Sequence, residues 1–268
     1  MRRVRRPAVA GMFYSADPGE LERSVREALS QAGPVTPVRA LVVPHAGYVY
    51  SGGVAGRTWG EARIPDVVIV VAVNHYGLGA PLATSSETWQ TPLGEIEPDA
   101  ALMARLTELA PAVVDDPAAH AREHSLEVQL PFLQLLKASV RFLPLQVGSG
   151  DRAALEGLGQ ALARLVEELE QPALLVASTD LTHYEPDEVV RREDRHAIER
   201  ILAVDGEGLL RVVAERRISM CGVAPTAAVL FAARALGAEQ AREVAYATSA
   251  DAGGDRDSVV GYVGCHVL

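Results

Sequence analysis

Cysteine and lysine are scarce in this sequence of 268 residues, which holds two cysteines, Cys221 and Cys265, and a single lysine, Lys137. Two cysteines in a chain of this length do not make the disulfide framework of a small secreted protein. Nor does an apolar segment follow the basic cluster Arg2–Arg6, as it would in a secretory signal peptide. We therefore expect a cytoplasmic protein, whose thiols stay free for metal binding or catalysis because that compartment is reducing.

Several other features are absent, and each absence narrows the function. No apolar run reaches the length of a transmembrane helix, so we expect no membrane association. The formal net charge of −10 argues against binding nucleic acid through its phosphates. The sequence also lacks a GxxxxGK(S/T) phosphate loop, a GxGxxG dinucleotide loop, a GxSxG nucleophile elbow and any CxxC pair. These absences disfavour nucleotide-dependent enzymes, serine hydrolases, zinc ribbons and iron–sulfur proteins.

Uninterrupted apolar segments recur along the chain. Val67–Val73 reads VVIVVAV, and Ala173–Ser178 reads ALLVAS. Such runs are typical of parallel strands, because helices cover both faces of a parallel sheet. With helical segments between them, they predict an α/β fold with a central, mostly parallel or mixed sheet flanked by helices. No linker or repeat divides the chain, so residues 1–268 are expected to form a single domain.

The expected strands and helices alternate along the sequence. Further strands are predicted at Ala40–Val43, Arg141–Val147, Val244–Thr248 and Val259–Val267, with an edge strand or hairpin at Ala83–Trp89. Helices are predicted at Pro18–Gln31, Gly53–Trp59, Pro98–Leu109, Arg152–Glu170, Asp187–Ala203, Gly206–Arg216 and Thr226–Leu236. Another helix is expected to begin around His124 and to continue through Ser125–Leu136.

Three histidines follow predicted strands by a few residues at most. His45 stands in Leu41–Gly56, LVVPHAGYVYSGGVAG, which begins as a buried strand and continues into a glycine-rich loop. His75 and His183 follow the strands VVIVVAV and ALLVAS. The carboxyl ends of parallel strands share one edge of the sheet, where α/β proteins bind their ligands. Imidazole is a common metal ligand, so these histidines are expected to meet at a metal site, although each taken alone could be an ordinary loop residue.

Cys221 and Asp180 are further candidates for this site. Cys221 precedes a glycine at a predicted helix start, where the helix dipole favours the thiolate, a strong ligand of Zn, Cu or Fe. Taken alone, Cys221 is better explained as a buried, inert thiol, and the core or sheet face better explains Cys265 and His266. Asp180 is expected to orient an imidazole or to cap the following turn. His183 is expected to be a ligand or the acid/base beside the metal.

Two sets of polar residues lie outside this group. Glu123, His124 and Glu127 form an acidic–histidine cluster, which we expect either to line the pocket or to form the polar start of a helix. His120 and His196 lie in polar helical surroundings and are expected at the surface.

Five segments together carry a family resemblance. In chain order they read PHAGYVYSG, NHYG, EHSLEVQLPF, STDLTHY and CGxxP. In this combination the chain resembles the Memo family, whose prokaryotic members are called AmmeMemoRadiSam system protein B, one of a set that includes a radical-SAM protein. The resemblance extends from GMFYSAD near the N-terminus to the last predicted strand.

The resemblance implies a fold similar to class III extradiol dioxygenases, non-haem iron enzymes that open catechol rings. By motif, His45, His75 and Cys221 match the family's metal-ligand positions. His183 matches the histidine that plays the acid/base part in the dioxygenases, and Asp180 lies just before it. The dioxygenases complete their ligand set with a carboxylate, whereas the matching group here is a thiol, which favours softer metals such as copper. Fe(II) is the expected metal, with Cu or Zn as alternatives.

The residues and the resemblance together favour a metal-dependent, dioxygenase-like oxidoreductase. Tyr48 or Tyr76 is expected to line its pocket. One alternative is a non-catalytic protein that keeps the cleft and binds a metal, a peptide or another partner, and a second is zinc-assisted hydrolysis with a His–Asp pair. The expected partners are a small molecule or peptide in the cleft and, through the resemblance, the radical-SAM protein.

Overall fold

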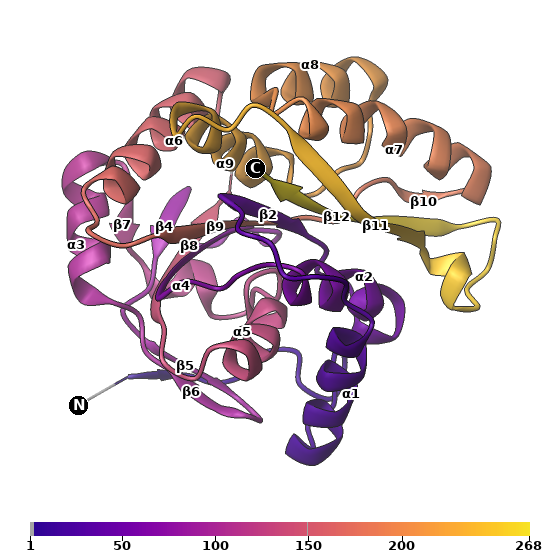
Figure 1. The fold of residues 1–268 in the computed structure, drawn as a ribbon, viewed down its shortest axis with the longest axis horizontal. Coiled ribbons are helices and arrows are strands. Elements are labelled where there is room, and N and C mark those ends of the chain that lie inside the picture. The colour runs from indigo at the N-terminus through magenta and orange to yellow at the C-terminus, as the bar shows by residue number, and fades with distance from the viewer. Residues whose placement is uncertain (1–2, 149) are drawn as a thin grey trace.

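The computed structural model describes residues 3–148 and 150–268, and its largest element is a mixed β-sheet (Figure 1). The strands β2 (Ala40–Val43), β9 (Ala173–Ser178), β3 (Val67–Val73) and β8 (Arg141–Val147) lie side by side in this order and run parallel. Antiparallel strands flank them. The mixed sheet with a parallel centre that the apolar runs predicted is confirmed.

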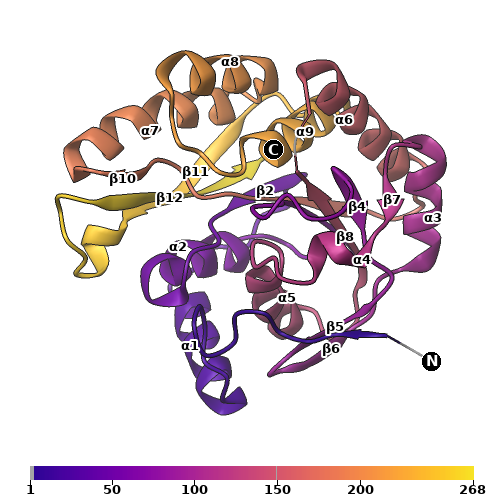
Figure 2. The same cartoon turned by 180° about the vertical axis from the view of Figure 1, so that it is seen from behind.

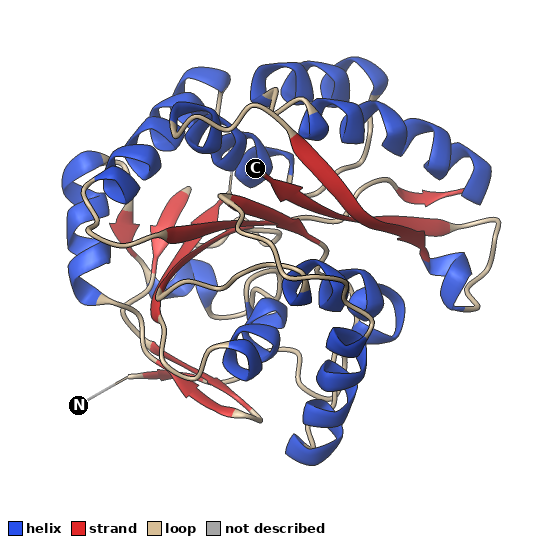
Figure 3. Ribbon diagram, viewed as in Figure 1, coloured by secondary structure: helices blue, strands red, loops and turns tan. Residues whose placement is uncertain are grey.

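The remaining strands extend the parallel centre in both directions or form a small second sheet (Figure 3). They are β1 (Val4–Arg5), β4 (Leu82–Thr84), β5 (Thr88–Thr91), β6 (Gly94–Ile96), β7 (Val114–Asp115), β10 (His183–Glu185), β11 (Ala241–Thr248) and β12 (Val259–Val267). β12 pairs with β2 on one side, and β4 pairs with β8 on the other. β10 and β11 both pair with β12, β7 pairs with β4, and β1, β5 and β6 make the small sheet.

Helices cover both faces of the large sheet. They are α1 (Pro18–Ser30), α2 (Tyr48–Gly60), α3 (Ala100–Leu109), α4 (Pro117–His120), α5 (Leu130–Leu136), α6 (Arg152–Glu167), α7 (Asp187–Leu202), α8 (Gly206–Arg216) and α9 (Val223–Ala235), with 3-10 turns at Glu127–Gln129 and Ser249–Ala252. α1, α2 and α5 lie on one side of the sheet and α6 to α9 on the other, as two opposite views show (Figures 1 and 2). In the described part of the chain, none of them combines the length and the apolar character that crossing a bilayer needs.

The central strand β3 shows why its sequence is apolar throughout. Val67, Ile69 and Val71 point into a core shared with α3, α6 and α9. The alternate residues of β3 point into the opposite core, which α1, α2 and α5 close. Every residue of the strand is buried, and burying one such side chain contributes about 1.5–3 kcal/mol, so no position favours a polar residue.

The predicted elements differ most from the structure in three places. α2 begins at Tyr48 instead of Gly53, so Gly52 and Gly53 lie in a helix and not in a glycine-rich loop. The segment that begins at His124 is a turn, and regular helix starts only at Leu130, after the 3-10 turn. The reason is local: the Glu123 carboxylate accepts the N–H groups of His124 and Ser125, at 2.8 and 3.0 Å, and holds the chain out of helical geometry. The predicted edge strand Ala83–Trp89 is divided into β4 and β5, because the two halves pair in different sheets.

The histidines outside the expected site also have defined places. His120 was expected at the surface but is fully buried at the end of α4. Its Nε2 lies 3.0 Å from the carbonyl oxygen of Ala83, and its ring meets that of Trp89 edge-on. The polar residues around His120 in the sequence did not reveal this burial, in which Nε2 has a carbonyl partner. Cys265 and His266 lie fully buried in β12, as expected.

Candidate functional site

Three neighbouring parallel strands end at one edge of the sheet and deliver side chains to the same place. β2 is followed by His45 and β3 by His75. β9 lies between these two strands and is followed closely by Asp180. Because neighbouring strands are about 4.8 Å apart, the loops after β2 and β3 start roughly 10 Å from each other. The strand order therefore brings His45 and His75 together, although they belong to separate loops.

Cys221 reaches the same point from a distant part of the chain. One ring nitrogen of His45, one of His75 and the Cys221 Sγ all lie within 4.8 Å of one another. His45 Nε2 is 3.2 Å from Sγ. Gly222 lets this loop lie against the end of β9, since a Cβ there would come within 2.5 Å of the Ser178 carbonyl oxygen. Metal–nitrogen and metal–sulfur bonds of about 2.0–2.3 Å need ligand atoms at roughly this mutual spacing.

Glu123 holds the ring of His75. Its carboxylate accepts the His75 Nδ1–H at 2.9 Å and the His75 backbone N–H at 2.6 Å. Burial would raise the pKa of Glu123, but the hydrogen bond and charge of His75 and the N–H of Ser125 outweigh it and lower the pKa to about 2. The ionised carboxylate keeps the imidazole proton on Nδ1, which leaves Nε2 of His75 with a free lone pair. Glu123 is fully buried behind His75 instead of lining the pocket.

Asp180 supports the main chain of the site. Its Oδ1 accepts the backbone N–H of His45 at 2.8 Å, and its own N–H donates to Cys221 Sγ at 3.3 Å. The carboxylate thus holds the loop after β2 through its backbone, whereas Asp180 was expected to orient an imidazole or to cap the turn that follows it. Burial raises the pKa of Asp180 to about 7.

His183 lines the cavity that adjoins His45, His75 and Cys221, but it does not belong to the cluster of their three ligand atoms. Its Nδ1 is 2.8 Å from the carbonyl oxygen of Ser219, which can only accept, so the imidazole proton is on Nδ1. Burial lowers the pKa of His183, and the ring is therefore neutral at pH 7 with Nε2 available as a proton acceptor.

His124 packs against both candidate ligand imidazoles, stacked on His75 and edge-on to His45. Its ring lies parallel to that of His75, with centroids 4.7 Å apart, and 5.4 Å from the ring of His45. Its Nδ1 is 3.2 Å from the Glu123 carboxylate. Burial lowers the pKa of His124 to about 4, so this ring is also neutral. The expectation that His124 lines the pocket is confirmed.

The site opens into a cavity of about 680 Å³. Its aromatic lining consists of Phe13, Tyr50, Tyr184 and Tyr262. Tyr48 and Tyr76 were expected in this cavity but do not line it. The hydroxyl of Tyr48 donates to the carbonyl oxygen of Val128, and Tyr76 is half exposed at the surface. None of the described lining residues is Lys or Arg, so the cavity has no fixed positive charge for an anionic ligand.

Burial also decides the protonation of the two innermost groups. The pKa of His45 lies well below its usual value, because the ring is buried and the other histidines surround it. The pKa of the Cys221 thiol is raised to about 12 by burial and by the charge of Asp180. Burial and the charge of Asp180 thus favour the protonated thiol, whereas the predicted helix start was expected to favour the thiolate.

Glu127 belongs to a buried ion pair beneath the site, not to the pocket lining. Its carboxylate lies 2.5 Å from the guanidinium of Arg5, and the two side chains are 0% and 2% exposed. The same carboxylate accepts the hydroxyl of Tyr14 at 2.6 Å and the backbone N–H groups of Ala8 and Val9. Glu127 thus ties the N-terminal segment, which carries Phe13 to the cavity, to the segment that carries the site histidine at position 124.

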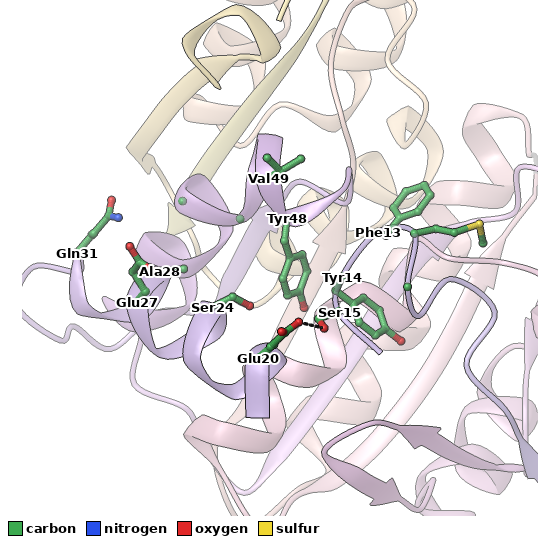
Figure 4. Close-up of a pocket in the computed structure, with 14 residues that line it drawn as sticks. Phe13, Tyr14, Ser15, Glu20, Ser24, Glu27, Ala28, Gln31, Tyr48 and Val49 are labelled. Atoms are coloured by element: carbon green, nitrogen blue, oxygen red, sulfur yellow. Dashed lines mark hydrogen bonds between the residues drawn. The ribbon is translucent and has the colours of Figure 1, made fainter. Parts of the chain in front are cut away.

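A second cavity, of about 700 Å³, lies between α1, the start of α2 and residues 11–15 (Figure 4). Ser15 and Glu20 lie next to each other on its wall, where the Ser15 hydroxyl donates a hydrogen bond of 2.9 Å to the Glu20 carboxylate. The described residues that line it include no histidine or cysteine. The candidate metal ligands His45, His75 and Cys221 line the first cavity instead.

Comparison with known proteins identifies the family. The family model for Memo-like proteins matches residues 5–266. The chain belongs to the Memo family. A MEMO1 family protein from Methanopyrus kandleri is 42% identical over 274 residues, covering 96% of this chain and 96% of that protein. One from Methanothermobacter thermautotrophicus is 37% identical and covers 97% of this chain and 98% of that protein.

A solved structure shares the fold of this Memo-family chain. It is that of an uncharacterized protein from Escherichia coli K12, with a TM-score of 0.57 and 18% sequence identity. The match covers 86% of this chain and all of that chain. At this identity the likeness concerns the fold alone. The resemblance to the Memo family that the five sequence segments suggested is confirmed by the family model and the relatives.

Proposed function

We propose that this Memo-family protein binds one transition-metal ion through His45, His75 and Cys221. The observation that supports the proposal is that these residues come from three separate segments, yet their ligand atoms lie within 4.8 Å of one another. Ser178 and Glu123 engage the Nδ1 atoms of the two imidazoles, so each Nε2 is left for a cation. Two neutral imidazoles and a thiol that loses its proton on binding form a donor set that fits a transition metal.

Fe(II) is the metal that we propose first, with Cu or Zn as alternatives. Three protein ligands leave coordination positions for a substrate or for oxygen, which is the arrangement of catalytic rather than structural sites. Imidazole suits Fe, Cu and Zn alike, whereas the thiolate favours the softer ions. Metal analysis of the purified protein distinguishes them.

The proposed reaction is an oxidation of the dioxygenase type on an uncharged aromatic ligand. The metal would supply Lewis acidity and redox capacity when bound. The aromatic lining and the lack of Lys and Arg among the described lining residues suit such a ring. His183, with its proton held on Nδ1 by Ser219, would accept a proton at Nε2 from a ligand hydroxyl. Asp180 would keep the His45 loop in place through its backbone bond.

Glu123→Gln is expected to weaken metal binding by about 10–100-fold, the usual cost of losing the carboxylate behind a ligating histidine. The amide keeps the size of the side chain but carries no charge and can donate to His75 Nδ1, which would move the proton to Nε2. Chelator competition with Zn(II) measures the affinity. An affinity within about twofold of the wild type would contradict the role that we assign to Glu123.

Oxygen uptake tests the proposed reaction. Protein loaded anaerobically with Fe(II) should consume oxygen when catechols are added, and His183→Gln should lower the rate by about 10²–10⁴-fold, the usual contribution of a general base. His196→Gln, a partly exposed histidine on α7, is the matched control and should retain full activity. If metal binds but no catechol supports uptake, the protein is better described as a non-catalytic metal- or peptide-binding protein.

A further inference from the structure

A chain of hydrogen bonds lies behind His45, and its donors can be assigned one by one. Trp59 Nε1–H can only donate, and it lies 2.9 Å from Gln129 Oε1. The amide nitrogen of Gln129 must then face the other way, where it donates to the carbonyl oxygen of Pro44 and to Ser178 Oγ, each at 2.9 Å. The orientation of this buried amide is therefore determined at both ends.

Ser178 connects Gln129 to the imidazole of His45. Its Oγ accepts from Gln129 and lies 2.6 Å from the carbonyl oxygen of Ser125, which can only accept. A hydroxyl has one hydrogen, and this one goes to Ser125. His45 Nδ1, at 3.0 Å from Ser178 Oγ, can then interact only by donating its own hydrogen. The lone pair of His45 is thus on Nε2, the atom that lies 3.2 Å from Cys221 Sγ.

We propose that Ser178, held by Gln129, is a positioning residue that keeps the proton of His45 on Nδ1 and so presents an unprotonated Nε2 to the metal position. The assignment itself needs only the hydrogen bonds, while its purpose rests on the proposed metal site. Ser178 and Gln129 are 0% and 1% exposed, so water cannot take over their bonds. His75 uses a carboxylate for the same task, whereas His45 uses a neutral hydroxyl and amide. The side chains of Ser178 and Gln129 therefore add no further charge near Asp180.

The first measurement is made on the wild-type protein. Nitrogen-15 NMR of the metal-free protein with labelled histidine, at about pH 8 where ordinary histidines are neutral, reports which ring nitrogen carries the proton. The resonances of His45 are identified by their loss in His45→Gln. We expect the Nδ1-protonated form in the wild type. Protonation of His45 at Nε2 would overturn the proposal.

Two substitutions test the path. Ser178→Ala removes the acceptor, so His45 should show a mixture of both protonated forms, and the Zn(II) affinity should fall by about 10–100-fold. Gln129→Met leaves the Ser178 hydroxyl in place but removes the amide that holds it. It should change the His45 spectrum and the Zn(II) affinity in the same direction as Ser178→Ala, but by a smaller amount. Gln146→Met is the matched control: Gln146 is also fully buried, but its amide atoms have no hydrogen-bond partner in the described structure. This variant should match the wild type in both readouts.

The outcomes separate the two proposals. If Ser178→Ala and Gln129→Met keep the wild-type His45 spectrum and Zn(II) affinity, the positioning role is wrong. If the wild type shows the Nδ1-protonated form but binds no metal, the proposed function fails while the hydrogen-bond assignment stands. If Ser178→Ala does not fold, the wild-type spectrum and the Gln129→Met variant still test the positioning role of Ser178.

Discussion

Cys221→Ala is expected to abolish stable metal binding. Loss of a partner behind a ligand alone costs about 10–100-fold in affinity, so loss of a ligand itself should exceed about 100-fold. Wild-type binding should also become tighter as the pH rises. The Cys221 thiol has its pKa raised to about 12 and must release its proton to bind, so the affinity should change about tenfold per pH unit near pH 8. Any weak residual binding by the variant should not show this dependence on pH, because no thiol proton is then released.

The other cysteine provides a matched control. Cys265 lies fully buried in β12, and Cys265→Ala removes a thiol without touching the site. We expect Cys265→Ala to bind metal like the wild type and Cys221→Ala to bind none. The measurements are chelator competition, metal analysis after dialysis and the rise in melting temperature on adding Fe(II) or Zn(II). At a free metal concentration of about 100 times Kd, binding stabilises the folded state by about 2.7 kcal/mol, which a melting curve resolves readily. A Cys221→Ala variant that binds like the wild type would refute the proposed ligand set.

Glu127→Ala is expected to have the largest effect on folding. Removing one partner of a buried ion pair costs about 3–5 kcal/mol, because the remaining charge stays buried without compensation. The substitution leaves the Arg5 guanidinium unpaired and takes the acceptor from the hydroxyl of Tyr14 and from the backbone N–H groups of Ala8 and Val9. Urea denaturation of the metal-free protein measures the loss in the free energy of unfolding.

Two further variants show whether the buried charge is the cause. The double variant Arg5→Met, Glu127→Leu removes both charges and should be more stable than Glu127→Ala, since no unpaired charge remains. Glu168→Ala breaks an exposed ion pair with Arg105 and should change the unfolding midpoint little, because water screens that pair. If Glu127→Ala unfolds at the same urea concentration as Glu168→Ala, the buried pair does not support the N-terminal segment as we describe.

Much of the sheet could be predicted from the sequence because its central strands are buried on both faces. β2, β3, β8, β9 and β12 have the bounds that their apolar runs predicted. The small strands β1, β6 and β7 have two or three residues each and carry no such run, so only pairing with distant segments defines them. The turn at His124 was missed for a different, local reason: the Glu123 carboxylate accepts the backbone N–H groups of the next two residues, which the helical pattern of the segment does not reveal.

The sequence by itself determined that His45 and His75 each follow a buried strand, since apolar runs and the polar residues that follow them are local properties of the chain. Only the tertiary structure decided that Cys221 joins them, 176 positions from His45, and that burial raises the pKa of its thiol. It also decided which groups stand behind each imidazole, Glu123 for one and Ser178 for the other. Such contacts depend on how strands and loops pack together, and no spacing along the chain encodes them.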